Sequence, residues 1–413
     1  MANDFAALDS KRRKYFITCL IGAFVVGIVY TWAILQIPFI NSLGGTAVQS
    51  TVVLCYTLSV ILSTMSPSLF GSFIRKAGPR LTIFVGTVIL ALSYFVSCNT
   101  SSMTVFYIAF GFGNGVGSGL IYPTMMGYLA TLFPDKRGSV SGTIAGVYGG
   151  AAIFWSPVLA YLINSFSLRT AGFFAGAVVL IGILPVAFVV RSMPDEYIAH
   201  KASQAKGSGK AGAKTNLPDL NRGQMVKTAM FYVALAAFSF GCTSGMMVIS
   251  QISSIMQQGY AMTATQAAVY VSLMSFMSMI GRFLWGTVTD HFDKYVTLSI
   301  ICALPVAAMG VASTAPAQTV TVACLAVVAC CYGGFGSTIT PITADLFGAK
   351  HVTENYGVMY LAFGFAALLG PQLALLLRSG GDFSKAFLVA AVISAVALAC
   401  ALIVRKKVKA ALQ

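Results

Sequence analysis

Charged residues are scarce in this 413-residue chain. Only 9% of its residues are Asp, Glu, Lys or Arg, whereas about 25% is usual for a soluble domain. So few charges cannot cover the surface of a soluble protein of this size, and the mean hydropathy of +0.83 agrees. The composition excludes a soluble enzyme, a secreted disulfide scaffold and a disordered chain. It favours a polytopic helical membrane protein.

Acidic residues and histidines are missing from the interiors of the apolar segments, where none of the 11 acids or 3 histidines lies. A membrane enzyme needs a nucleophile with a base, or metal ligands, at that depth, and a channel needs a polar file or charged rings. Both classes are therefore disfavoured. The nine cysteines lie in apolar segments without metal spacing to histidine, so we expect them to be packing residues, and we expect no cofactor and no metal.

Long hydrophobic runs are abundant instead. The run between Lys14 and Arg75 contains no charge and is long enough for two crossings at about 20 residues each. The first run is too long for a signal-peptide core, so we expect it to be retained as a helix. The sequence predicts an all-α membrane protein with twelve transmembrane helices, at residues 15–38, 48–70, 81–98, 104–132, 139–164, 171–191, 227–256, 264–287, 296–313, 319–345, 355–377 and 384–404.

The basic residues are concentrated on one side of this predicted topology. Of the 26 Lys and Arg residues, 22 fall in the tails, loops and linker on the side that holds both termini, and Arg169, Arg378 and Lys385 fall on the other. The positive-inside rule makes the first side cytoplasmic, in the cell (inner) membrane. The net charge of +15 is therefore a signal of topology. We also expect it to attract the tails to anionic lipid. The sequence has no basic face with interleaved aromatics, so we expect no binding to nucleic acid.

The spans divide into two halves of six, 1–191 and 227–413, joined by a polar linker over 192–226 that we expect to be a flexible cytoplasmic loop. The halves share residues at offsets of 214–218, among them Pro123 with Pro341 and Pro157 with Pro371. Parallel six-helix repeats with a site between them are a transporter architecture. The alternative is that small residues recur wherever membrane helices pack closely.

Several motifs resemble the major facilitator superfamily. Residues 71–80, Gly-Ser-Phe-Ile-Arg-Lys-Ala-Gly-Pro-Arg, resemble its loop motif between helices 2 and 3, with Arg75 in place of the usual Asp, whereas the second copy keeps Asp290. Tyr30-Thr31-Trp32, the stretch 133–138 and Asn355-Tyr356-Gly357 resemble the oxalate:formate antiporter family and the related monocarboxylate transporters. The resemblance implies a transporter in the lipid bilayer that works by alternating access, and not an enzyme. We expect a monomer.

Arg282 is the one charge predicted inside the membrane. An arginine at a helix centre costs about 2.5–3.5 kcal/mol even on insertion scales. With no embedded acid in the sequence, a substrate carboxylate suits its guanidinium, which binds carboxylates in bidentate geometry. The alternative is snorkelling, because Arg282 lies near the cytoplasmic end of its span. In the families that the chain resembles, an Arg here contacts the substrate's carboxylate.

Aromatic residues form the second candidate set. A phenol offers an apolar wall and a hydrogen-bond donor, which suits a small amphiphilic anion. The resemblance places five tyrosines at cavity positions, and the alternative for each is packing or lipid contact. We add Phe335, with less support, and Phe363. The tyrosines are Tyr30, Tyr122, Tyr148, Tyr332 and Tyr360.

Two departures from the related families refine the predicted substrate and coupling. Phe363 stands where the oxalate transporter pattern has a lysine, so only one cation, Arg282, remains for the substrate. One cation suits one carboxylate, which predicts a monocarboxylate such as lactate, pyruvate or formate. Ser278 stands where proton-coupled relatives have an acid, one turn before Arg282. Anion exchange, facilitated diffusion and symport of a proton on the substrate all remain open.

Two alternative functions are weighed against this one. An oxalate or other dicarboxylate:formate antiporter is the nearer alternative. A multidrug exporter would favour an acid-containing cavity. At the predicted cytoplasmic gate, Asp135, Lys136 and Arg137 are expected to act with Asp290, the alternative being a solvated run of charges.

Overall fold

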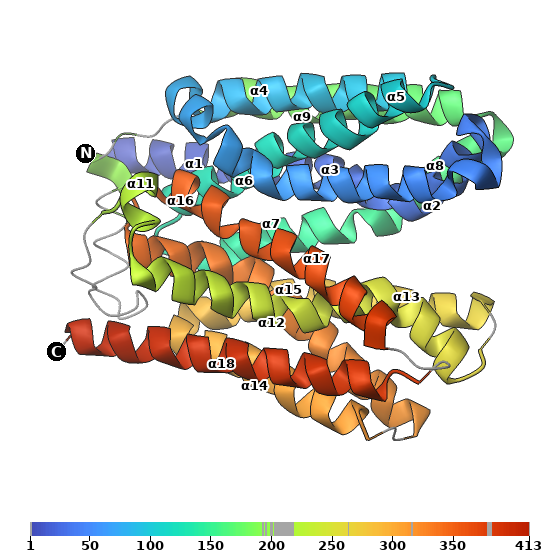
Figure 1. Ribbon diagram of the computed structural model, residues 1–413. Helices are drawn as coiled ribbons and strands as arrows, with labels where there is room; N and C mark the ends of the chain where they lie inside the picture. The colour runs from blue at the N-terminus through green and yellow to red at the C-terminus, as the bar shows by residue number, and fades with distance from the viewer. Residues whose placement is uncertain are drawn as a thin grey trace. The chain divides into compact units, whose positions relative to one another are not determined.

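The computed structural model describes residues 2–191, 194, 196–198, 201, 219–262, 264–314, 317–377 and 382–412, and most of them are helical (Figure 1). The central part of the predicted linker, 202–218, and Arg378 lie outside the described residues. In the described part of the chain, eleven helices are long and apolar enough to cross a membrane. Of two shorter apolar helices, Ile34–Leu43 overlaps the end of the first predicted span and runs beyond it, and Leu54–Leu69 lies within the second. The all-helical prediction is confirmed, whereas the count of twelve and the side of the termini stay predictions.

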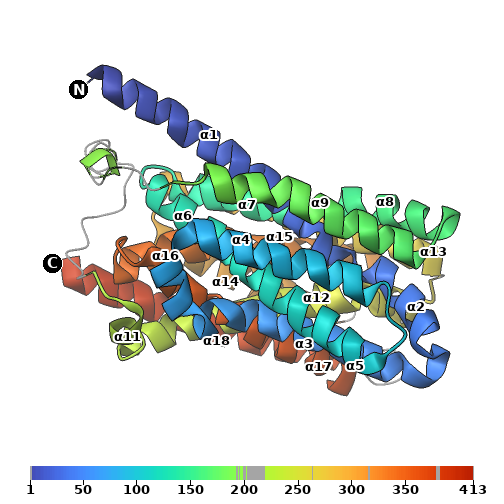
Figure 2. The ribbon, with the colours of Figure 1, turned by 90° about the horizontal axis from the view of Figure 1, so that it is seen from above.

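The chain forms two compact units, and the boundary falls inside one helix, α7. Unit 1 comprises Met1–Leu132 and Val147–Ala199. Its helices α4 and α9 pack along each other and lie side by side in Figure 2. Its elements are α1 (Ala2–Val26), η1 (Gly27–Thr31), α2 (Trp32–Leu43), η2 (Gly45–Val48), α3 (Gln49–Leu69), α4 (Gly71–Ser97), α5 (Met103–Phe106), η3 (Tyr107–Asn114), α6 (Gly115–Leu132), the end of α7 (Arg137–Gly150), α8 (Ala152–Ser165) and α9 (Leu168–Val189).

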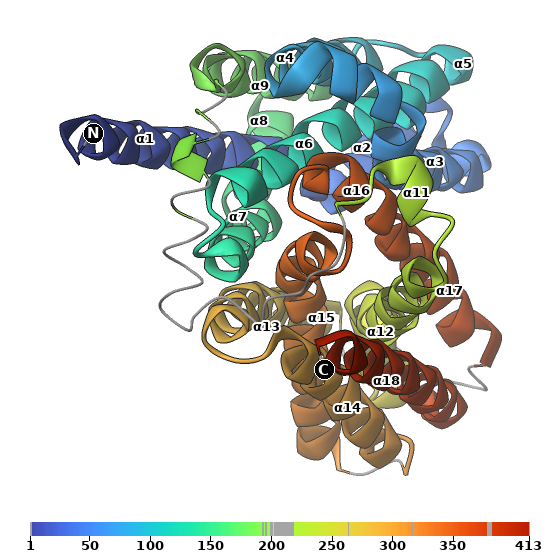
Figure 3. The same cartoon turned by 90° about the vertical axis from the view of Figure 1, so that its left-hand side faces the viewer.

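Unit 2 comprises Phe133–Gly146 and His200–Gln413, so it contains the first part of α7. In it α13 packs along α15, and α12, α14 and α18 are neighbours, as Figure 3 shows. Its other elements are α11 (Arg222–Met225), α12 (Ala229–Ser254), η4 (Ile255–Gly259), α13 (Ala264–His291), α14 (Lys294–Ala312), α15 (Gln318–Phe347), α16 (Val352–Met359), α17 (Leu361–Leu377) and α18 (Ser384–Leu412).

Two predicted spans of unit 1 contain breaks in α-helical geometry, and a third break precedes another span. The first span passes through the 3₁₀ segment η1, and the fourth passes through the π-helical segment η3 between α5 and α6. Before the third span, Gly78 has φ +72° and ψ 173°, a conformation that a residue with a side chain rarely adopts. These breaks change which helix face each following residue occupies.

Hydrogen bonds anchor both ends of the predicted linker. Next to unit 1, the buried hydroxyl of Tyr197 donates to Asp9 of α1, and burial raises the pKa of this tyrosine to about 12, so it stays a neutral donor. In unit 2, the amide of Leu220 donates to the carbonyl of Phe347, and the Asn355 side chain donates to the Leu220 carbonyl, both at 2.9 Å. The described ends of the linker therefore belong to the folded units.

Close packing of α13 on α15 gives a test of the fold of unit 2. A Cβ on Gly281 would overlap the backbone of Cys330, which cannot move aside as a side chain can, whereas a Cβ on Gly310 of α14 would meet no atom within 4 Å. Gly281→Ala is expected to lower the melting temperature of the purified protein by several degrees or to prevent folding. Gly310→Ala is expected to leave it unchanged or slightly raised, because alanine favours a helix over glycine. Equal melting temperatures for the two variants would contradict this packing.

Candidate functional site

Arg282 lies where α13 is held tightly against α15. A Cβ on Gly333 of α15 would lie 2.9 Å from the Arg282 amide nitrogen and would overlap the carbonyl oxygen of Ser278. Ser278 is buried at this contact, and the Arg282 side chain is half-buried. The absence of a side chain at Gly333 therefore allows α15 to hold the backbone from which the arginine projects.

The Arg282 guanidinium is directed toward α7. Its Nη1 atom donates a 2.7 Å hydrogen bond to the carbonyl oxygen of Ala145. Ala145 lies eight residues after Arg137, the first residue of α7, which is about 12 Å along a helix at 1.5 Å per residue. The head group is thus held beside the interior of a helix. This geometry orients its planar fork and does not correspond to snorkelling past the helix end.

Three predicted aromatic residues of unit 2 lie together. The ring of Phe363 lies 6.0 Å from that of Tyr332 and 5.4 Å from that of Tyr360, centroid to centroid. A Cβ on Gly336 would lie 4.0 Å from both Phe363 and the Ala145 side chain. Gly336 has no side chain, and the space beside it lies between Phe363 of the aromatic cluster and the Ala145 side chain. The carbonyl of Ala145 is the one that accepts the bond from Arg282.

Phe335 lies apart from this cluster. Its side chain is fully buried, and its ring lies 6.0 Å from Phe238 of α12 in an edge-on arrangement. A Cβ on Gly241 of α12 would lie against the Phe335 ring. The structure thus places Phe335 in the packing of α15 on α12.

The other three predicted tyrosines form a cluster in unit 1. Tyr148 stacks on Tyr122 of α6, with ring centroids 4.0 Å apart, and meets the edge of Tyr30 at 4.9 Å. A Cβ on Gly27 would lie 2.5 Å from the Tyr148 carbonyl oxygen, so the glycine lets η1 approach α7 and brings Tyr30 to Tyr148. Tyr30 is 41% exposed, whereas Tyr122 and Tyr148 are buried. The cluster therefore presents one accessible phenol backed by two buried ones.

Asp290 caps the first turn of α7. Its two carboxylate oxygens accept hydrogen bonds from the amides of Gly138 and Ser139, both at 2.7 Å. A carboxylate at a helix N-terminus satisfies unpaired amides and interacts favourably with the helix dipole. Asp290 thus fixes the start of the helix that carries Ala145, eight residues before the Arg282 contact.

The other predicted gate residues lie at the same end of α7. Lys136 is exposed, which fits a solvated charge. The charge of Arg137 interacts with several carboxylates of unit 2, namely those of Asp345, Asp135, Asp290 and Asp219. Asp345 in turn accepts a 2.9 Å bond from Lys294 and a 2.6 Å bond from the Tyr295 hydroxyl. The sequence prediction missed Lys294, Tyr295 and Asp345, because their contacts join residues about fifty positions apart.

A glycine stripe on α7 was also missed. Gly138, Gly142 and Gly146 face α13, and a Cβ on any of them would clash with Gly286, Arg282 or Phe283. Glycines spaced by four residues lie on one helix face and allow membrane helices to approach closely. That spacing is visible in the sequence and is the signal that would have found this contact.

Long apolar helices packed into two compact units are typical of a polytopic membrane protein. The chain belongs to the Major Facilitator Superfamily, whose family model matches residues 15–342. It is therefore a transporter and a multi-pass membrane protein, and not an enzyme, as the motifs predicted.

Known proteins resemble this chain over most of its length. It is 26% identical over 390 residues to the oxalate:formate antiporter of Oxalobacter formigenes, covering 92% of this chain and 88% of that protein. It is 25% identical over 322 residues to monocarboxylate transporter 11 of Mus musculus, covering 76% and 69%. The crystal structure of the human organic anion transporter MFSD10 matches with a TM-score of 0.73 at 14% identity, covering 94% of this chain and 99% of that one. This last likeness shows the fold alone.

Proposed function

We propose that this protein transports small organic anions with a single carboxylate, of the lactate, pyruvate or formate kind, by alternating access. Arg282 binds the carboxylate. The observation that carries the proposal is the guanidinium of Arg282, oriented inside unit 2 by the carbonyl of Ala145. The names of the relatives, an oxalate:formate antiporter and a monocarboxylate transporter, support an anionic substrate.

The aromatic residues supply the remainder of the proposed recognition. Tyr332, Tyr360 and Phe363 form an apolar wall with hydroxyl groups at its edge, suited to the short carbon skeleton of a monocarboxylate. In unit 1, Tyr30 is the accessible phenol of a stacked cluster, and we propose it as a second hydrogen-bonding element for the substrate. One cation with aromatic walls suits one carboxylate better than two.

The coupling mechanism follows from the residue one turn before Arg282. Ser278 does not titrate, so we propose that the protein either exchanges one anion for another or carries a proton bound to the substrate's own carboxylate. Both mechanisms keep the charge of the protein constant through the cycle. Uptake by proteoliposomes with and without internal anion separates them, because exchange needs the internal anion and symport acidifies the lumen.

A binding screen followed by counterflow tests the substrate class. The purified protein is heated with formate, acetate, lactate, pyruvate, oxalate and malonate, and a ligand at 100 times its Kd adds about 2.7 kcal/mol of stability. We expect monocarboxylates to raise the melting temperature and to drive counterflow of a labelled monocarboxylate. Stabilisation by oxalate or malonate alone would establish the dicarboxylate:formate alternative. Stabilisation by cationic drugs, with none by carboxylates, would establish the multidrug alternative.

The Tyr30 hydroxyl gives a test of the unit 1 cluster. Tyr30→Phe keeps the ring contact with Tyr148 and removes only the hydroxyl, so we expect the melting temperature to stay within a few degrees of the wild type. KM for the monocarboxylate is expected to rise roughly tenfold, because a hydrogen bond to a charged group contributes about 1.5 kcal/mol or more. Tyr161→Phe, at a side chain that is 65% exposed on α8, is the matched control. An unchanged KM in Tyr30→Phe would remove its hydroxyl from the binding site.

A further inference from the structure

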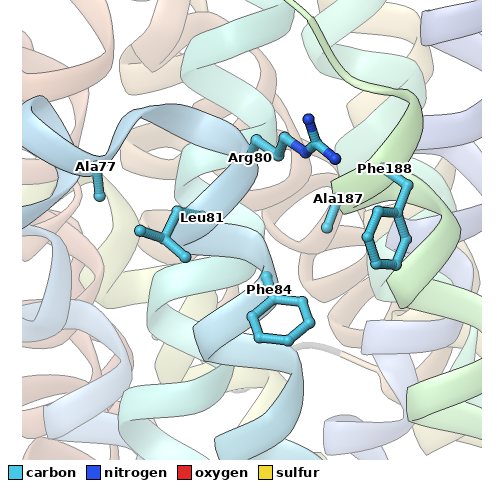
Figure 4. Close-up of a pocket in the computed structure, with 6 residues that line it drawn as sticks. All are labelled: Ala77, Arg80, Leu81, Phe84, Ala187 and Phe188. Atoms are coloured by element: carbon cyan, nitrogen blue, oxygen red, sulfur yellow. The ribbon is translucent and has the colours of Figure 1, made fainter.

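A groove separate from the proposed substrate residues lies on the surface of unit 1, between α4 and α9 (Figure 4). Its volume is about 330 Å³. Five of its six lining residues are apolar and one is a cation, and none is acidic. The lining residues are Ala77, Arg80, Leu81, Phe84, Ala187 and Phe188.

Local sequence explains why a groove forms here. The positive φ of Gly78 breaks α4, and Pro79 then begins its long straight part, as proline commonly does at a first helical position. Arg80 and Phe84, four residues apart, share one face of that helix. On α9, Ala187 is small and Phe188 is large, so the floor of the groove is low and its wall is aromatic. The rings of Phe84 and Phe188 are 6.4 Å apart and edge-on.

Arg80 lies at one end of this apolar groove. Its guanidinium carbon lies 5.7 Å from the centroid of the Phe188 ring, a cation–π contact that holds the head group over the wall. Within the described residues, no ion pair involves Arg80. The surrounding chain is also positive, because Arg75, Lys76 and Arg191 are nearby in sequence and no acid occurs between Asp9 and Asp135. The groove thus has an apolar lining and a positive charge at one end.

The apolar part of the groove faces outward. Leu81, Phe84 and Phe188 are 46%, 38% and 54% exposed, and they lie on helices of membrane-spanning length. In a membrane protein, such exposed apolar side chains contact lipid chains. On the predicted topology this end of α4 is cytoplasmic, and the cytoplasmic leaflet carries anionic lipid that basic pockets between helices bind by the head group.

We propose that this groove is a binding site for one anionic phospholipid. The phosphate pairs with the Arg80 guanidinium, and an acyl chain lies along Leu81, Phe84 and Phe188. A soluble anion would gain from the arginine alone and would leave the apolar wall uncovered, whereas a phospholipid satisfies both parts. The lipid also covers the aromatic contact between α4 and α9, so its binding stabilises unit 1.

Native mass spectrometry of the full-length protein tests the site. The protein is mixed with phosphatidylglycerol or phosphatidylcholine of identical acyl chains, and the wild type is expected to retain phosphatidylglycerol preferentially. Arg80→Gln is expected to weaken that binding at least tenfold, and Phe188→Ala to weaken it severalfold. Arg169→Gln, at an exposed arginine that begins the other end of α9, is the matched control and should bind as the wild type does.

Three outcomes would overturn the proposal. Equal retention of the two lipids would show that the head group is not recognised. Equal binding by Arg80→Gln and the wild type would place the anionic lipid elsewhere. Competition by glycerol 3-phosphate as strong as that by phosphatidylglycerol would show that the site takes a free phosphate and does not use the apolar wall. None of these measurements depends on which substrate the protein transports.

Discussion

Replacing Arg282 with lysine is expected to reduce monocarboxylate uptake by about 100-fold, because one of the two hydrogen bonds to the carboxylate is lost and each is worth about 1.5–3 kcal/mol. Lysine keeps the positive charge, but it lacks the planar fork that binds both carboxylate oxygens. Its ammonium is also not held by the Ala145 carbonyl in the orientation that the 2.7 Å bond gives the guanidinium. Uptake of labelled substrate into proteoliposomes, normalised to folded protein, measures the effect.

A matched control shows whether the loss of uptake is specific to Arg282 or follows from replacing any arginine. Arg169 is exposed at the start of α9, so Arg169→Lys is expected to transport at the wild-type rate. The melting temperature of Arg282→Lys in the absence of substrate should stay within a few degrees of the wild type, while stabilisation by substrate is lost. Wild-type uptake by Arg282→Lys would remove this residue from substrate binding and would return the snorkelling interpretation.

Replacing Asp290 with alanine is expected to reduce uptake at least tenfold and to lower the melting temperature. The variant loses two hydrogen bonds from the Gly138 and Ser139 amides. Each bond to a charged group contributes about 1.5–3 kcal/mol. Because the start of α7 is then no longer fixed to α13, Ala145 loses its position, and with it the orientation of Arg282. Asp290→Asn keeps one strong acceptor and is expected to be intermediate in both measurements.

Asp293 provides the comparison for that experiment. It caps its own helix, α14, by accepting bonds from the amides of Tyr295 at 2.8 Å and Val296 at 3.0 Å. Asp293→Ala is therefore expected to cost about 1 kcal/mol of stability, as the loss of an ordinary helix cap does, and to leave uptake unchanged. Similar uptake by the two alanine variants at matched stability would show that the Asp290 cap does not control transport.

The predicted spans agree well with the helices because membrane burial requires long apolar runs. The predicted span 171–191, for example, starts and ends within a few residues of α9. The breaks at η1 and η3 were not predicted, since no apolar pattern distinguishes a 3₁₀ or π turn from an α-helical one. Gly78 was visible as part of a motif, but its positive φ depends on the direction that the chain takes after α3.

The candidate site could be predicted in its residue types and not in its contacts. Arg282 was identifiable because it is the only cation in the interior of a predicted span, and Tyr30 because of its place in a motif. The acceptor of the arginine, Ala145, is 137 residues away and is a backbone carbonyl. No side-chain pattern marks it, so only the packing of glycines between α7 and α13 shows where the guanidinium points.

The π-helical segment η3 makes the fourth span tolerant of a change in chain length at one place. A π-helical turn accommodates one residue more than an α-helical turn. Deleting a single residue within Tyr107–Asn114 would let the segment relax to regular α-helix and would leave the residues after it on nearly the same helix faces. Tyr122, which follows in α6, would then still stack on Tyr148. A deletion in the regular α-helix of α6 before Tyr122 would instead rotate that tyrosine by about 100°, so η3 is where this span can lose a residue and keep the stacked tyrosines.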